Sequence, residues 1–331
     1  MEDKAFFSFI EQALHYFNRP HKQAVTTPVS SPAAWRGAEM PPLESMAHYL
    51  SGQERADILK AVSEAAALGK PTLELVATDF PLPALEEKFR EWRRTLMEGI
   101  GFQVIRGVPL EQWSLAEAEL FFWCFGLHLG RPGQQNPAGH LLGHVINTGA
   151  AQEDSAARLY KTAANIDYHC DAADVVGLFC LRKAKAGGKS RIVSSVTVFN
   201  ELLKRRPDLA GRLFKPMLLD IRDKEMNEAG SSLPIQPCCY ADGALRTFYH
   251  ADYFRSVTRH SNVAPLTELE QDLLDSYEAI AMEPALYLEM DLQPGDIQLL
   301  SNHSNLHART DYDDYEEPSR WRHLLRLWLS L

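Results

Sequence analysis

Short strand-like segments dominate the chain from about residue 140 to its end. Only two helical patterns interrupt them, at about 197–206 and 267–282, and the second opens with Thr267 and Glu270 at the spacing of a capping box. The strand-like segments are HLLGHVINT, VVGLFCLRKA, SRIVSSV, LRTFYH, LYLEM, DIQLL and HLLRLWLSL. Many short strands with few helices predict two β-sheets packed face to face, with helices outside them.

The first hundred residues have a different texture. Helical patterns occupy about 53–68 and 83–98, and each ends at glycine. The segment 21–42 is rich in proline, serine and threonine, which predicts a loop or an extended arm. We therefore expect a mainly helical region, residues 1–100, that packs on a β core formed by residues 101–331 as part of one structural unit.

Charge and composition exclude several classes of function. The formal net charge of −10 opposes a bulk electrostatic grip on nucleic acid or on an anionic membrane. No run approaches the roughly 20 apolar residues that span a bilayer, and the first residues lack the apolar core of a signal peptide. Five cysteines without a C-x-x-C pair suit a reducing compartment. We expect a cytoplasmic protein whose partners are small molecules, not nucleic acids or membranes.

The segment NIDYHCDAADVVGLFCL holds a candidate metal site. Residues two apart in an extended segment share a face, so His169 and Asp171 would project together with Cys170 turned away. An imidazole and a carboxylate supply two ligands of the facial triad that holds Fe(II) with open positions. The third ligand would be a distant histidine, and GDIQLLSNHSNLHARTDYDD supplies His303 and His307. A chance pair on a surface turn is the competing interpretation.

The last strand-like segment places two arginines on one face. Alternation puts Arg322 and Arg326 beside Leu324 and Trp328. Two guanidiniums inside a barrel are unfavourable unless each meets an anion, and a guanidinium fork holds a carboxylate through two hydrogen bonds. The alternative is a solvated edge strand that carries arginine at every fourth position.

The motifs follow one another along the chain as a His-x-Asp pair, a distant histidine and then two arginines. In this order they resemble the motifs of the taurine dioxygenase-like (TauD/TfdA) family of Fe(II)/2-oxoglutarate oxygenases. The resemblance runs from about Gly101 to the end, and YHCDAADVVGLFCLRKAKAGGKSRIVSS and PGDIQLLSNHSNLHARTDYDDYEEPSRWRHLLRLWLSL carry its most specific parts. It implies an α+β fold with a mainly β core, a double-stranded β-helix (jelly-roll), surrounded by helices with a helical N-terminal extension. The implied cofactors are Fe(II), the cosubstrate 2-oxoglutarate, and O₂.

The resemblance also implies roles for individual residues. His169, Asp171 and His307 match the iron ligands, and His307 is favoured over His303 because the family's histidine follows an asparagine turn by about five residues. Arg322 matches the arginine that binds the distal carboxylate of 2-oxoglutarate. The other cosubstrate candidates are Ser190, which replaces the family's threonine, and Arg326, whose role could be exchanged with that of Arg322. The candidates for the substrate pocket are Asn165, Tyr168, Arg255 and Arg326.

These roles predict a dioxygenase that oxidises an unactivated C–H bond of a small metabolite, such as an amino acid or another carboxylate, in secondary metabolism. Hydroxylation is the default outcome, with desaturation or cyclisation as alternatives, and succinate and CO₂ are released. Because Asp171 is present, halogenation is not expected. A homo-oligomer is compatible with the resemblance.

Three other functions compete with this prediction. A catalytically silent jelly-roll protein would bind a ligand or a partner without turnover, but every iron and 2-oxoglutarate position retains suitable chemistry. A zinc hydrolase would lack the H-E-x-x-H base and would leave the paired arginines unexplained. Demethylation of nucleic acid fits poorly with the acidic charge.

Overall fold

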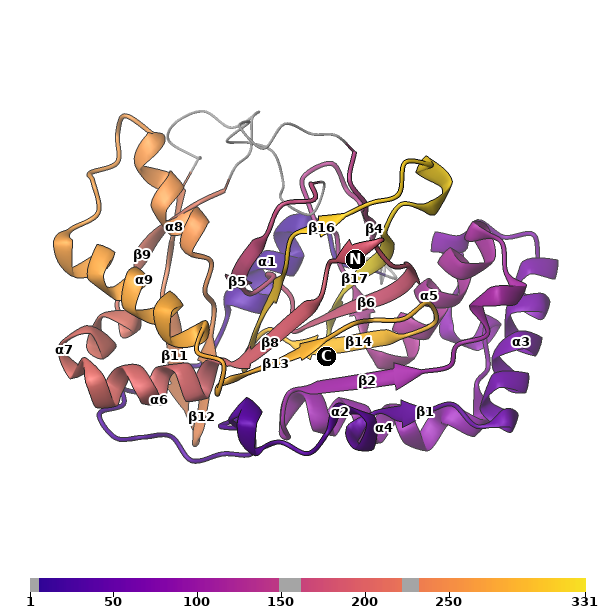
Figure 1. Cartoon of the computed structure of the whole chain (residues 1–331), viewed down its shortest axis with the longest axis horizontal. Helices are drawn as coiled ribbons and strands as arrows, with labels where there is room; N and C mark the ends of the chain where they lie inside the picture. Colours follow the sequence, from indigo (N-terminus) through magenta and orange to yellow (C-terminus); the bar gives the residue numbers. More distant parts are fainter. Residues whose placement is uncertain (1–5, 149–161, 222–231) are drawn as a thin grey trace.

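Two facing β-sheets form the centre of the computed structural model, which describes residues 6–148, 162–221 and 232–331 (Figure 1). The larger sheet has seven strands in the order β1-β2-β14-β6-β17-β3, with β4 paired to β17. The smaller sheet has four, in the order β13-β8-β15-β5. Their bounds are β1 (His48–Tyr49), β2 (Phe102–Arg106), β3 (Arg131–Pro132), β4 (Leu142–Val145), β5 (Ile166–His169), β6 (Val175–Arg182), β8 (Ser190–Ser194), β13 (Tyr287–Met290), β14 (Ile297–Ser301), β15 (Asn305–Arg309) and β17 (His323–Ser330).

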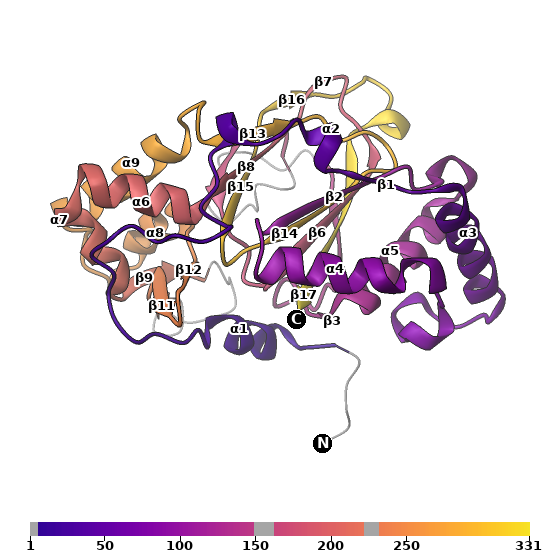
Figure 2. The same cartoon turned by 90° about the horizontal axis from the view of Figure 1, so that it is seen from below.

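Helices gather at the two ends of the sheets (Figure 2). The first group consists of α3 (Gly52–Ala67), α4 (Glu86–Met97) and α5 (Leu115–Leu129). The second group consists of α6 (Ser195–Arg205), α7 (Pro207–Ala210), α8 (Ala251–Ser256) and α9 (Glu268–Ala281). The short helices α1 (Phe9–Phe17) and α2 (Leu43–Met46) belong to the chain before α3. No described helix has the length and apolar character that crossing a membrane requires.

Three two-stranded sheets complete the described strands. Two of them lie near the second helix group: β9 (Met217–Asp220) with β10 (Ser232–Ile235), and β11 (Cys238–Ala241) with β12 (Ala244–Thr247). The third pairs β7 (Ala186–Gly187) with β16 (Tyr312–Asp313). This last pair joins the turn before β8 to the segment that follows β15.

Strand β17 shows how the sequence pattern builds the core. It is antiparallel to β6, and every residue in it is buried. Leu325, Leu327 and Leu329 pack into the apolar cluster formed with α3, α4 and α5. Leu324 and Trp328 belong to the cluster between the sheets, so alternate residues face opposite layers. The predicted alternation of this segment is therefore what the structure has.

The N-terminal hundred residues are joined to the sheets by pairing and packing. Strand β1 is parallel to β2 and extends the larger sheet. Ile58 and Trp92 share a cluster with Phe121 and Leu325, which ties α3 and α4 to α5 and β17. Whether this region is a separate unit stays a prediction, but its apolar residues contribute to the cluster that covers the larger sheet.

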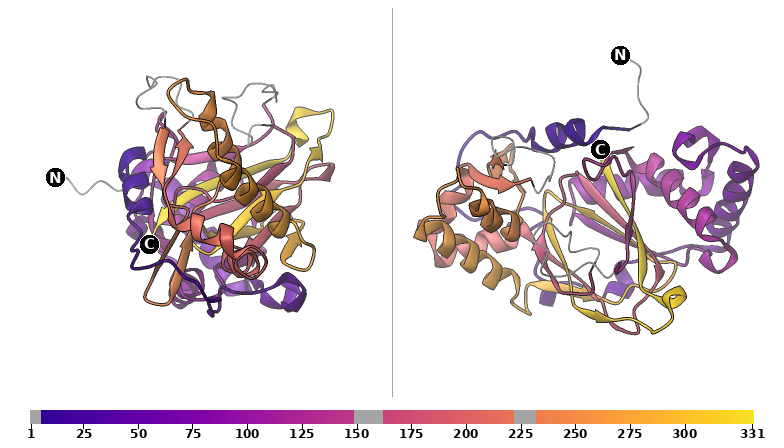
Figure 3. Two further views of the ribbon diagram at one scale, coloured as in Figure 1. Left: turned by 90° about the vertical axis from the view of Figure 1, so that its left-hand side faces the viewer. Right: turned by 90° about the horizontal axis from the view of Figure 1, so that it is seen from above.

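The carboxylate of Asp174 links three distant parts of the chain. It accepts hydrogen bonds from His303 Nε2 (2.7 Å), His15 Nε2 (2.8 Å) and the backbone N–H of Leu331 (2.9 Å). These partners lie before β15, in α1 and after β17, and Figure 3 shows α1 near the C-terminal end. The buried Asp174 therefore fastens both ends of the described chain beside the segment that follows β5.

We expect Asp174→Asn to lower the free energy of unfolding at neutral pH. Burial by itself raises the pKa of Asp174, but hydrogen bonds from His303, Leu331 and His15 lower it from 3.8 to about 2. A depressed carboxyl pKa stabilises the fold above the unfolded value, and that contribution is lost as the pH falls from about 4 to about 2. The shift corresponds to about 2 kcal/mol. Urea unfolding at several pH values checks this prediction. If the variant lost free energy of unfolding between about pH 4 and about pH 2 as steeply as the wild type, the prediction would be contradicted.

Candidate metal centre

Three metal-ligating side chains converge where β5 pairs with β15. His307 lies directly opposite His169 in the ladder, and the centroids of their rings are 4.1 Å apart. Asp171 lies just beyond β5, and its Oδ2 is 3.8 Å from His307 Nε2. One ligand atom from each of the three lies within 4.8 Å of the others. The structure thus brings together the three residues that the sequence predicts, with the spacing of a single small ion.

The protonation states of these groups suit a divalent metal. His169 Nδ1 lies 2.8 Å from the carbonyl oxygen of Asp167, so as a donor it leaves Nε2 free to bind a metal. Burial, with the neighbouring His169, lowers the pKa of His307 to about 3 and keeps it neutral. Burial raises the pKa of Asp171, but the charge of Arg326 opposes this effect, and the net shift is downward. A neutral imidazole and a carboxylate are the forms that metal binding requires.

The segment that carries Asp171 is held by Asn302. The Asn302 side chain accepts the backbone N–H of Asp171 (3.0 Å) and donates to the carbonyl of Ala173 (2.9 Å). His303, the alternative third ligand, points elsewhere: it bonds Asp174 and stacks on Tyr16 at 4.8 Å. The geometry therefore favours His307 over His303 as the third ligand.

A cavity of about 60 Å³ opens beside two of the ligands, His169 and His307. Its apolar wall consists of Val145, Ile166, Leu178, Leu292 and Leu324. Arg322 and Arg326 both enter it, as the alternation along β17 predicts, and both are more than 90% buried. Two buried guanidiniums in an apolar pocket require anionic partners.

The two arginines have different surroundings. Arg326 lies near the candidate ligands: its Nη1 is 3.5 Å from both carboxylate oxygens of Asp171, and its Nε donates to Gln135 Oε1 (2.8 Å). Arg322 lies against Gly188, with its Nη1 buried and without a hydrogen-bond partner among the described residues. Gly188 has a φ of 68°, and a Cβ there would come 2.9 Å from Arg322 Nε. The glycine turn thus makes room for this guanidinium.

Ser190 lies at the same end of the cavity as Arg322. Its side chain is buried, and its Oγ donates to Gln298 Oε1 at 2.9 Å. Across the β8–β15 ladder it lies opposite Arg309. We call the part of the cavity beside His169, His307 and Arg326 its metal end, because Arg326 contacts Asp171. The second end is the part beside Ser190, Arg309 and Arg322, since Ser190 pairs with Arg309 and both arginines lie near Tyr312.

The structure does not bring the other predicted substrate residues to this cavity. Asn165 is exposed and donates to the Asp167 carboxylate (2.6 Å). Tyr168 points into the apolar cluster on the other side of β5 from His169. The guanidinium of Arg255 is paired with Asp275 and Glu278 on α9 (2.7 and 2.6 Å). Their substrate roles stay predictions without a supporting contact.

Sequence reasoning missed several residues near the site. Arg309, which was not among the predicted site residues, lines the cavity. The sequence did contain a signal for this position, because a residue two positions after His307 in a strand lies on the same face as His307. Gln135, which orients Arg326, gave no signal because it comes from a loop far away in sequence. His250, whose ring centroid is 5.0 Å from that of His169, also lay outside any motif.

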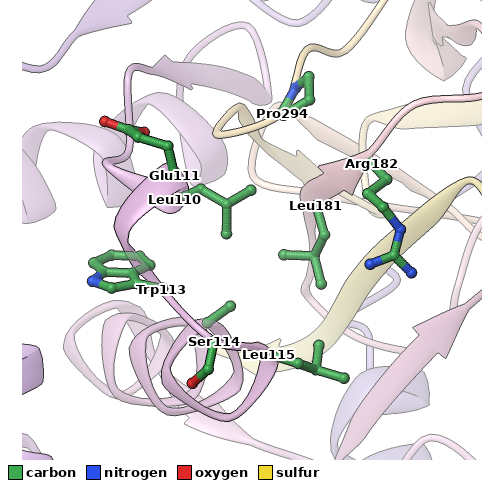
Figure 4. A pocket seen from close by; sticks show the side chains of 9 residues that line it. Leu110, Glu111, Trp113, Ser114, Leu115, Leu181, Arg182 and Pro294 are labelled. Atoms are coloured by element: carbon green, nitrogen blue, oxygen red, sulfur yellow. The ribbon is translucent and has the colours of Figure 1, made fainter. Parts of the chain in front are cut away.

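A larger hollow of about 540 Å³ lies away from these residues (Figure 4). It is bounded by the short helix η5 (Leu110–Gln112), the start of α5 and the end of β6. In the part of the chain that the structure describes, His169, Asp171 and His307 are the one group arranged to hold a metal ion. None of these three residues lines the larger hollow.

Comparison with known proteins identifies the family. The model of the taurine catabolism dioxygenase TauD, TfdA family matches residues 66–328. The chain belongs to this family. FR-33289 synthase of Streptomyces rubellomurinus is 30% identical over 316 residues, which cover 92% of this chain and 91% of that protein. The taurine hydroxylase-like protein SAT17 of Stachybotrys chartarum is 28% identical over 304 residues, covering 89% and 77%.

Solved structures agree with the fold. An asparagine oxygenase in complex with Fe(II), 3-hydroxyasparagine and succinate has a TM-score of 0.67 at 16% identity, covering 86% of this chain and 93% of that one. The non-haem iron oxygenase OrfP, in complex with Fe and α-ketoglutaric acid, has a TM-score of 0.62 at 17% identity, with the same coverage. As a member of the TauD, TfdA family, the protein is a 2-oxoglutarate-dependent oxygenase that uses Fe(II) and O₂. The resemblance seen in the sequence is confirmed.

Proposed function

We propose that the protein hydroxylates an unactivated C–H bond of a small metabolite that carries a carboxylate. One observation carries the cofactor assignment: two of the candidate ligands, His169 and His307, line the same cavity as Arg322, a buried guanidinium with an unpartnered N–H among the described residues. A metal at one end and an unsatisfied cation at the other suit a ligand that chelates through one end and is anionic at the other. 2-Oxoglutarate has this chemistry.

The residues present fit both groups. His169, Asp171 and His307 would hold Fe(II), because they offer two imidazoles and a carboxylate and leave open positions. Arg322 and Ser190 would hold the distal carboxylate of 2-oxoglutarate. When bound, iron and 2-oxoglutarate supply the activation of O₂, and the cosubstrate leaves as succinate and CO₂. The apolar wall of the cavity excludes water from the reacting groups.

Arg326 has a different role in this proposal. Its guanidinium already faces the Asp171 carboxylate and Gln135, so it is less available to a cosubstrate than that of Arg322. It orients Asp171 and keeps it charged, and its position near the metal end lets it face an anionic substrate group. This distribution of roles assigns the distal carboxylate to Arg322.

The proposed substrate is an amino acid or a similar small carboxylate. The structural neighbours support this class, since their complexes hold 3-hydroxyasparagine and (3S)-hydroxy-L-arginine. His250 stacks on Tyr253 at 3.7 Å beside His169, so these two rings would form a wall next to the metal. Such a wall would orient the substrate carbon toward the open positions of the iron.

The test begins without substrate. Anaerobic titration of the apo-protein with Fe(II) and then with 2-oxoglutarate should produce the weak visible charge-transfer band of the chelate. In air, a panel of L-amino acids should then raise succinate release above the uncoupled rate, and the product should gain the mass of one oxygen atom. A folded protein that holds iron but gives neither the band nor succinate would contradict the proposal.

A further inference from the structure

A third arginine enters the cavity with most of its donors unused. Arg309 lies on β15, two residues after His307, and its side chain is 6% exposed. Its Nη2 donates to the carbonyls of Thr162 (2.9 Å) and Ala164. Its Nε and Nη1 are buried and have no hydrogen-bond partner among the described residues. One nitrogen therefore anchors the segment before β5, and two remain unsatisfied.

Arg309 and Arg322 share a neighbour, the ring of Tyr312. The guanidinium carbon of Arg309 is 4.7 Å from the centroid of the Tyr312 ring, and that of Arg322 is 5.2 Å from the same centroid. Neither guanidinium forms an ion pair with a described carboxylate. The acidic neighbour, Asp314, instead accepts the backbone N–H of Arg322 (2.7 Å). Two positive charges are thus buried close together, with Asp314 as a nearby counter-charge that forms an ion pair with neither guanidinium.

This arrangement is unfavourable unless an anion joins it. Two neighbouring guanidiniums repel each other, and each lost water when it was buried. A carboxylate has two oxygens that accept up to about four hydrogen bonds, so two arginines can share one. We propose that Arg309 is a second guanidinium for the distal carboxylate of 2-oxoglutarate, which it shares with Arg322. This inference rests on the proposed function.

The position of Arg309 favours the cosubstrate over the substrate as its partner. In the β8–β15 ladder Arg309 is opposite Ser190, whose side chain is buried at the end of the cavity that Arg322 enters. Arg326, which contacts Asp171, lies on β17 four residues after Arg322. An anion reaching both Ser190 and Arg322 would therefore come within reach of the free donors of Arg309.

The experiment compares two ligands that differ by one group. 2-Oxopentanoate has the same chelating end as 2-oxoglutarate and lacks the distal carboxylate. Dissociation constants of both are measured anaerobically on the Fe(II)-loaded protein by calorimetry, for the wild type and Arg309→Met. We expect the variant to bind 2-oxoglutarate at least about tenfold more weakly and 2-oxopentanoate equally well. Equal weakening of both ligands, or of neither, would overturn the proposal.

Two further variants separate this role from a structural one. Arg19 is also a buried arginine with an unpartnered Nε, and it donates to the carbonyls of Gln236 and Pro237 away from the cavity. Arg19→Met should match the stability loss of Arg309→Met without changing the affinity for 2-oxoglutarate. If Arg309→Met does not fold, Arg309→Lys keeps a charge without the fork, and a wild-type affinity in that variant would argue against the shared clamp.

Failure of this inference is distinguishable from failure of the proposed function. If the wild type does not bind 2-oxoglutarate more tightly than 2-oxopentanoate, the assignment of Arg322, Ser190 and Arg309 to the distal carboxylate is wrong. If the wild type discriminates and Arg322→Met loses that discrimination while Arg309→Met retains it, only the second guanidinium is wrong.

Discussion

Replacing His307 with alanine is expected to remove Fe(II) from the protein and to lower succinate formation by more than about 100-fold. Loss of a group that merely orients a metal ligand costs about 10–100-fold, and loss of the ligand itself should cost more. His307 is the ligand that comes from the second strand of the site, opposite His169 in the ladder. Iron content after anaerobic reconstitution and single-turnover succinate yield measure the effect.

His303→Ala is the matched control for this variant. His303 is a buried histidine four residues before His307, but it bonds Asp174 and stacks on Tyr16. This variant should bind iron like the wild type and unfold at a lower urea concentration, because it removes a hydrogen bond to a buried carboxylate. If His303→Ala lost iron and His307→Ala kept it, the assignment of the third ligand would be reversed.

Arg322→Met should raise the dissociation constant of 2-oxoglutarate by about two to three orders of magnitude. The variant removes one partner of a buried charge pair, and the carboxylate would enter an apolar pocket with less compensation. Iron binding should be unaffected, since Arg322 lies at the end of the cavity away from the three ligands. Titration of the charge-transfer band gives both constants.

The ligand itself supplies the control for Arg322→Met. 2-Oxopentanoate, which lacks the distal carboxylate, should bind this variant and the wild type with similar affinity. A variant that lost affinity for both ligands would show that Arg322 supports the fold of the cavity. Arg326→Met should instead disturb the metal end, because its guanidinium faces Asp171.

The sequence was informative where a side chain's role depends on local periodicity. Alternation along β17 placed Arg322 and Arg326 on the cavity face, and the spacing of Thr267 and Glu270 predicted the capping box that opens α9. The His-x-Asp pair also obeyed the two-residue rule, with Cys170 buried on the opposite side. These features involve neighbours in the sequence, so short-range geometry was sufficient to predict them.

The sequence was less informative where the partner is distant or where a strand is short and wholly buried. Strand β15 was not among the expected strands, although its five residues alternate between polar and apolar, because all five are buried and the polar ones do not face solvent. The pairing of Arg255 with α9 was missed because the carboxylates lie 20 and 23 residues away. Nothing local predicted that Gln135 would orient Arg326, since 191 residues separate them. Tertiary packing decides such contacts.

The contacts of Asp174 join the neighbourhood of the candidate metal centre to segments that are distant along the chain. His15 and Leu331 lie 159 and 157 residues from it, on opposite sides along the chain, and both meet its carboxylate three residues beyond Asp171. Such contacts form slowly, because distant segments must meet before any of them contributes stability. The segment that carries Asp171 is therefore expected to become ordered late in folding, after these distant segments have met, and to bind iron only then.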